Sequence, residues 1–117
     1  MNRLEEIAYK RKKAHTKFMQ LKSRVYEKFL ELEKAAFSEG ALSTKTKELI
    51  GVGISVIKDC ESCMQWHIEQ AAKAGAGMEE VLEAIEVAIE FGGGPATVSA
   101  RFALEVIEDV FESSQTR

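Results

Sequence analysis

The chain has 117 residues, of which 45% are hydrophobic and 30% are charged. This is the size and composition of one globular domain, with nothing spare for a second. A net charge of −3 gives no general electrostatic attraction to nucleic acid or to an acidic membrane surface, so we expect neither as a partner. We therefore expect a single domain over residues 1–117, with an N-terminal helical arm over about 1–15 and a core over about 16–112.

We expect neither a secretory signal nor a membrane-spanning segment. The first residues, MNRLEEIAYK, lack an uninterrupted apolar stretch, and no segment reaches the roughly 20 apolar residues needed to cross a bilayer. The only cysteines, Cys60 and Cys63, stand three positions apart, so they cannot join distant parts of a fold. A reducing compartment and a working dithiol fit this pair better than a structural disulfide, and we expect a cytoplasmic protein.

The distribution of apolar residues predicts an all-α fold, a single-domain bundle of about five or six helices. Strand-like alternation is nowhere sustained, and the single proline and the clustered glycines lie between helical segments. The segment Leu4–Lys13 forms a helix of its own or extends the next one. The other helices are expected over about Thr16–Phe37, from Ser43 or Thr44 to about Ile57, over Cys60–Lys73, over Met78–Phe91 and from Pro95 onward.

Two of these helices have features that bear on the site. The helix that ends near Ile57 has apolar residues around nearly its whole circumference, which predicts a central helix packed on several sides. Glu48 lies at the polar end of this apolar run. For the helix that follows, Asp59 is the expected N-cap, since an aspartate side chain can accept a hydrogen bond from a first-turn amide.

Cys60, Cys63 and His67 occupy positions i, i+3 and i+7 of one predicted helix, which places all three on one side within about 60°. A thiolate, the reactive form of cysteine, is stabilised at a helix N-terminus, and a histidine one turn from Cys63 can exchange a proton with it. An antiparallel hairpin would bring part of the preceding helix beside the cysteines. Whether Glu48 itself arrives there does not follow from the spacing.

Two other interpretations of the same residues remain. The cysteines could be buried core residues, since cysteine is among the most often buried residue types. Cys, Cys and His are also zinc ligands, but structural zinc takes four protein ligands and the only other histidine, His15, lies in an unrelated segment. We therefore expect no metal and no cofactor.

The order Glu48, eleven residues, Cys60, two residues, Cys63, three residues, His67 resembles the signature of the alkylhydroperoxidase D-like (carboxymuconolactone decarboxylase-like) family. The resemblance is nearly continuous from Phe29 to about Ala100. It includes the stretch GALSTKTKELIGVGISVIKDCESCMQWHIEQAAKAGA and the turn EFGGGPA.

The resemblance implies a homo-oligomer, commonly a trimer or hexamer, and a peroxidase cycle like that of peroxiredoxins. Cys63 would attack a hydroperoxide, Cys60 would resolve the sulfenic acid, and Glu48 and His67 would relay protons. The substrate would be a hydroperoxide or a disulfide, and an external dithiol, either a protein or a small molecule, would restore the pair. Ser62 stands where known peroxidases of the family have a histidine. Alternatives are a carboxymuconolactone decarboxylase-type lyase and a non-enzymatic redox-sensing oligomer.

Overall fold

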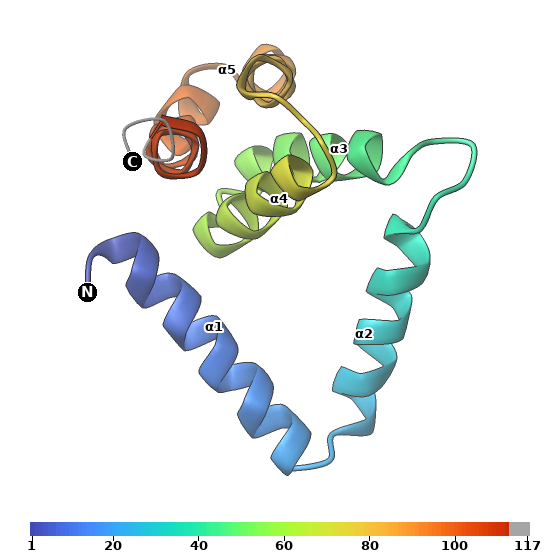
Figure 1. Cartoon of the computed structure of the whole chain (residues 1–117). Helices are drawn as coiled ribbons and strands as arrows, with labels where there is room; N and C mark the ends of the chain where they lie inside the picture. Colours follow the sequence, from blue (N-terminus) through green and yellow to red (C-terminus); the bar gives the residue numbers. More distant parts are fainter. Residues whose placement is uncertain (113–117) are drawn as a thin grey trace. The chain divides into compact units, whose positions relative to one another are not determined.

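The computed structural model describes residues 1–112, and every regular element in that range is a helix (Figure 1). The predicted all-α fold is confirmed. No helix within these residues is both long enough and apolar enough to cross a membrane. The elements are α1 (Arg3–Gln20), α2 (Arg24–Phe37), α3 (Thr44–Ile57), α4 (Glu61–Lys73), α5 (Met78–Ile107) and a π-helical turn, η1 (Glu108–Glu112).

The chain divides into two compact units, Met1–Glu39 and Gly40–Arg117. The first unit contains α1 and α2, and the second contains α3, α4 and α5 with the catalytic candidates. This boundary lies well beyond the expected end of an N-terminal arm near residue 15. That the whole chain acts as one domain stays a prediction.

In the first unit, the prediction of one helix over about Thr16–Phe37 is wrong. The chain leaves the helix after α1 because Lys22 adopts a left-handed conformation with φ of 55°. The Ser23 side chain then caps α2 by accepting a hydrogen bond from the backbone N–H of Tyr26. Tyr26 ties the two helices together, since its ring stacks on Phe18 and its hydroxyl lies 2.6 Å from Nδ1 of His15.

The core of the second unit lies between α3, α4 and α5, each of which contacts the other two. Burying branched and long apolar side chains in this way is the main source of stability for a small helical domain. The largest fully buried side chains are Val52 and Val56 of α3, Met64 and Ile68 of α4, and Val81, Ile85 and Val106 of α5.

A tight turn makes α3 and α4 an antiparallel hairpin. Asp59 lies in the left-handed region with φ of 51°, and the backbone N–H of Cys60 donates to the carbonyl of Ser55 over 3.1 Å. The predicted N-cap at Asp59 is therefore wrong, because a residue in this conformation cannot cap the helix. Cys60 is the N-cap, and α4 begins at Glu61.

The predicted break between Phe91 and Pro95 is present as a kink inside α5. Gly93 has φ of 66° and ψ of −147°, a conformation that is essentially restricted to glycine. Pro95 lies in the first turn after it, where a missing N–H costs nothing. Just before the kink, a Cβ at Gly92 would lie 2.9 Å from Cδ1 of Ile57, so the absence of a side chain lets α5 approach α3 closely.

α3 packs against both α4 and α5, as expected of a central helix, but one of its sides is not covered within the described structure. Ile50, Ile54 and Ile57 are about half exposed, and Phe91 of α5 is 80% exposed. Between α3 and α5 lies an apolar cavity of about 850 Å³.

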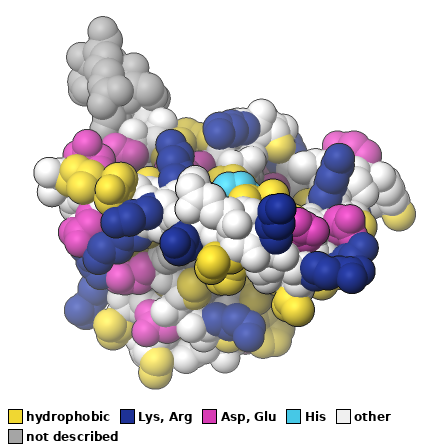
Figure 2. Space-filling view, turned by 90° about the horizontal axis from the view of Figure 1, so that it is seen from below, with side chains coloured by type: hydrophobic (Ala, Val, Ile, Leu, Met, Phe, Trp, Pro, Cys, Tyr) yellow, Lys and Arg dark blue, Asp and Glu magenta, His cyan; other side chains and the backbone are white. Residues whose placement is uncertain are grey.

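On the face shown in Figure 2, positive and negative side chains are interspersed rather than gathered in one charged area.

Candidate active site

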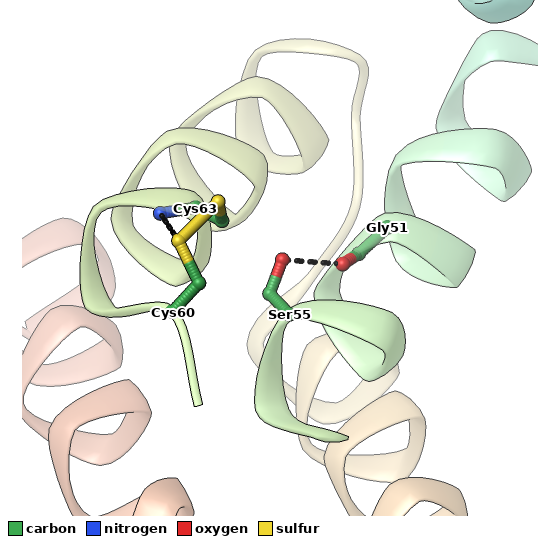
Figure 3. Close-up of a disulfide and its surroundings, with 4 residues drawn as sticks. All are labelled: Gly51, Ser55, Cys60 and Cys63. Atoms are coloured by element: carbon green, nitrogen blue, oxygen red, sulfur yellow. Dashed lines mark hydrogen bonds between the residues drawn. A yellow bond between two sulfur atoms is a disulfide. The ribbon is translucent and has the colours of Figure 1, made fainter. Parts of the chain in front are cut away.

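The two cysteines form a disulfide at the start of α4 (Figure 3). Their Cα atoms are 5.2 Å apart, within the range that a disulfide can bridge. Sγ of Cys60 also accepts a hydrogen bond from the backbone N–H of Cys63 over 3.3 Å. The sulfur of Cys60 is therefore both half of the disulfide and the cap of α4.

His67 and Glu48 form a largely buried pair that joins α4 to α3. Nδ1 of His67 lies 2.7 Å from Oε1 of Glu48, and the exposed fractions of the two side chains are 16% and 8%. An ionised carboxylate can only accept hydrogen bonds, so Nδ1 donates the proton in this bond. In a neutral imidazole that makes this bond, Nε2 is the nitrogen without a proton.

The surface of α3 that faces α4 is built from small residues beside Glu48. Gly51 lies against the imidazole of His67, since a Cβ at this position would be 3.1 Å from both Cγ and Nδ1 of the ring. Ser55 is buried, and its hydroxyl donates to the carbonyl of Gly51 over 2.6 Å. Figure 3 shows Ser55 and the carbonyl of Gly51 on the side of α3 next to the cysteines.

The structure thus brings the four predicted site residues into two pairs. Cys60 is bonded to Cys63, and His67 contacts Glu48. The contact of Glu48, which helix spacing left open, is made with His67. Sequence reasoning missed Gly51 and Ser55. A signal was present, because Glu48, Gly51 and Ser55 follow the same i, i+3, i+7 spacing as Cys60, Cys63 and His67.

The described residues do not gather into a metal centre. Across residues 1–112, no group of three or more His, Cys, Asp or Glu side chains has the arrangement needed to hold a metal ion. The polar groups of the site bond one another instead: carboxylate with imidazole, hydroxyl with carbonyl, and sulfur with amide.

Comparison with known proteins gives consistent relationships in sequence. A family model described as the carboxymuconolactone decarboxylase family matches residues 23–106. A protein of the cox locus of Paracoccus denitrificans, itself uncharacterized, is 39% identical over 82 residues, which is 70% of this chain and 74% of the relative. An uncharacterized protein of Cupriavidus necator is 40% identical over 76 residues, which is 65% of this chain and 67% of the relative.

Solved structures show the same fold. A carboxymuconolactone decarboxylase family protein from Legionella pneumophila superposes with a TM-score of 0.88 at 34% identity, covering 94% of this chain and 98% of the other. A Thermotoga maritima protein of that family, for which a role in antioxidative response has been suggested, superposes with a TM-score of 0.84 at 27% identity. That match covers 95% of this chain and 94% of the Thermotoga chain.

Proposed function

The chain belongs to the carboxymuconolactone decarboxylase family, and from that premise we propose that it is a thiol-dependent oxidoreductase with alkylhydroperoxidase-like activity. The observation that supports this most directly is the disulfide at the start of α4, two turns before a histidine paired with a buried glutamate. A decarboxylase has no evident use for a disulfide-forming cysteine pair. An enzyme that reduces peroxides or disulfides by a dithiol mechanism depends on one.

The proposed cycle starts from the dithiol. The Cys63 thiolate attacks the distal oxygen of a hydroperoxide, the O–O bond breaks, and the alkoxide leaves as an alcohol after taking up a proton. Cys63 is then a sulfenic acid. Cys60 attacks its sulfur, releases water and forms the disulfide observed here. An external dithiol reduces this disulfide and becomes a disulfide itself, so that two electrons pass from the donor to the peroxide.

His67 and Glu48 are proposed as the acid and base of this cycle. With its Nδ1 proton held by Glu48, His67 presents a basic Nε2 that takes the thiol proton of Cys63, one helical turn away. The same proton can later reach the leaving alkoxide. Glu48 fixes the tautomer and stabilises the imidazolium that forms in between, which is the task of a carboxylate behind a catalytic histidine.

Cys60 is proposed as the resolving thiol. Its sulfur accepts the backbone N–H of Cys63 at the first turn of α4, and a helix N-terminus stabilises negative charge. A thiolate at this position attacks the sulfenic acid on Cys63 without a separate base. The proposed partners are a hydroperoxide or disulfide substrate and a dithiol donor, in a cytoplasmic setting and with no added cofactor.

We further propose that the chain forms a homo-oligomer, a trimer or a hexamer. Support comes from the exposed isoleucines of α3 and from Phe91, which surround the cavity between α3 and α5. Large apolar side chains that are exposed side by side on a small protein are typical of a surface that another protein covers. We propose a second copy of the chain as the protein that covers this surface, because it is present wherever the protein is.

The proposal is tested by single-turnover oxidation of the reduced protein with an organic hydroperoxide, followed by recovery with a dithiol. We expect Cys63→Ser to abolish oxidation, and Cys60→Ser to leave a sulfenic acid on Cys63 that a dimedone reagent traps. His67→Gln should slow oxidation roughly 10²-fold, as for the loss of a general acid or base. The exposed Glu86→Gln is the control and should change nothing.

Two results would contradict the proposal. One is the absence of turnover with any hydroperoxide or disulfide although both thiols are reduced. The other is a lactone decarboxylase activity that survives replacement of both cysteines, which would assign the chain to the lyase chemistry for which the family is named.

A further inference from the structure

The imidazole of His67 rests directly on the backbone of α3 at Gly51. A Cβ built on Gly51 would lie 3.1 Å from Cγ, 3.1 Å from Nδ1 and 3.4 Å from Cε1 of His67. These distances are tighter than nine in ten real Cβ contacts, because carbon–carbon contacts are optimal at about 3.5–4.0 Å. Even a methyl group at residue 51 would therefore require the ring to shift by a few tenths of an ångström.

The edge of the ring that meets Gly51 is the edge that bonds Glu48. Nδ1 is both 3.1 Å from the hypothetical Cβ and 2.7 Å from Oε1 of Glu48. Glu48 and Gly51 are three residues apart on α3, so one turn of this helix supplies both the acceptor and the space beside it. A ring pushed away from residue 51 must lengthen or bend its bond to Glu48.

The backbone at Gly51 is itself held in place. Its carbonyl accepts the buried hydroxyl of Ser55, and the carbonyl of Ser55 accepts the N–H of Cys60. The contact surface for His67 is thus connected, through one side chain and one turn of α3, to the residue that begins α4. The imidazole of His67 and the backbone of Cys60 therefore both contact the stretch of α3 from Gly51 to Ser55.

We propose that Gly51 is a positioning residue of the active site: by lacking a side chain it holds the imidazole of His67 in line with Glu48, and this bond fixes the tautomer of the ring. This proposal rests on the proposed function for its catalytic consequence. Its structural part, that residue 51 holds His67 against Glu48, does not depend on which substrate the protein reduces.

The direct test is Gly51→Ala, read by ¹⁵N NMR of the imidazole nitrogens. The chain has only two histidines, so His15→Gln assigns the signals without ambiguity. We expect the Nδ1 and Nε2 signals of His67 to move toward those of an exchanging mixture of tautomers. Oxidation of the reduced protein by hydroperoxide should slow at least 10-fold, while the helical circular dichroism is retained.

Gly53→Ala is the matched control. It adds the same methyl group to the same helix, but its Cβ faces the carbonyl of Ala84 on α5 at 3.3 Å rather than His67. We expect it to leave the His67 signals unchanged. A Gly51→Ala protein with imidazole signals and an oxidation rate within twofold of the wild type would overturn the proposal. Changed signals in a protein that never reduces a peroxide would support the positioning and refute only the proposed function.

A double-mutant cycle decides the matter if Gly51→Ala folds poorly. Alanine is a better helix former than glycine, so Gly51→Ala should raise the denaturant midpoint wherever the methyl group has room. We expect that gain in a His67→Ala background, where the ring is gone, and a lower midpoint in the wild-type background. An equal change in both backgrounds would show that residue 51 does not act through His67.

Discussion

Glu80, in the first turn of α5, bonds in two directions at once. Its Oε1 accepts the backbone N–H of Gly77 at 3.0 Å, and its Oε2 lies 3.0 Å from Nζ of Lys45. The backbone hydrogen bond of Gly77, and then the ammonium group of Lys45, hold the pKa of Glu80 below its ordinary value of 4.5. A carboxylate with a lowered pKa stabilises the fold above its ordinary pKa, and this contribution is lost as the pH falls through the lowered value.

We predict that Glu80→Gln lowers the thermal midpoint at pH 7 and that the difference from the wild type shrinks below about pH 4.5. The reason is that acid protonates Glu80 in the wild type and so produces the same neutral side chain. Thermal unfolding followed by circular dichroism at several pH values measures this. The control is Glu79→Gln, which removes the same charge from the same turn while leaving both bonds of Glu80. A difference between Glu80→Gln and wild type that is constant with pH would contradict the prediction.

At the same scale, the sequence placed the cysteine pair and His67 together as candidates on one helix face, because helix periodicity needs only local spacing. The contact of Glu48 could not be derived this way. Glu48 and His67 are 19 residues apart, and their distance depends on the turn at Asp59, whose left-handed conformation has no strong signature in a non-glycine residue. The role of Cys60 as N-cap was missed for a related reason, since Asp59 is the better capping residue by preference alone.

Gly93 determines the form of α5. Its φ of 66° and ψ of −147° interrupt helical geometry between two helical halves, and no atom outside its local backbone lies within 4 Å of the position its Cβ would take. The requirement for glycine is therefore purely conformational. It sets the direction in which the second half of α5 delivers Phe102, Ala103 and Val106 to the core.

We predict that Gly93→Ala lowers the free energy of unfolding by about 1–3 kcal/mol, the cost of holding a residue with a Cβ in this region. Gly94→Ala adds a methyl group one residue later, where φ is not positive and the space is equally open, and should stay within about 1 kcal/mol of the wild type. Urea unfolding of both variants compares them directly. Equal stability of the two variants would show that the kink does not depend on the conformation of Gly93.

The helix boundaries show where sequence patterns stop being informative. The break near residue 92 was predictable, since three glycines and a proline follow one another there. The break at Lys22 was not, because the apolar residues Phe18, Leu21 and Val25 keep helical spacing across it. Helical spacing shows which face is apolar. It does not reveal a turn when the apolar residues on both sides of the turn keep the same spacing.

For the molecule as a whole, the spacing of apolar residues predicted an α3 that is apolar on nearly every side, but could not say which side stays uncovered. Within the described residues, Val52 and Val56 are buried, whereas Ile50, Ile54 and Ile57 face the cavity between α3 and α5. A helix that is apolar on every side has the same sequence pattern whether the same chain or another copy covers each side. Only the packing in the structure distinguishes these two cases.

We predict that Ile54→Glu weakens self-association at least ~100-fold, because a carboxylate would be buried without a partner in the proposed interface. Light scattering coupled to size exclusion over a range of concentrations measures the mass. Val98→Glu is the control, since Val98 is as exposed as Ile54, 53% against 51%, and lies outside the cavity lining. A wild-type protein that is monomeric at all concentrations, or an Ile54→Glu protein of unchanged mass, would contradict the proposed interface.

The sulfur of Cys60 also connects two equilibria that are usually measured separately. This atom both closes the disulfide and caps α4. Oxidation of the cysteine pair and folding of the first turn of α4 are therefore thermodynamically linked. Any change that strains the start of α4 more in one redox form than in the other must shift the midpoint potential by the same free energy. The helix start thus helps to determine which dithiol donors are strong enough to reduce the protein.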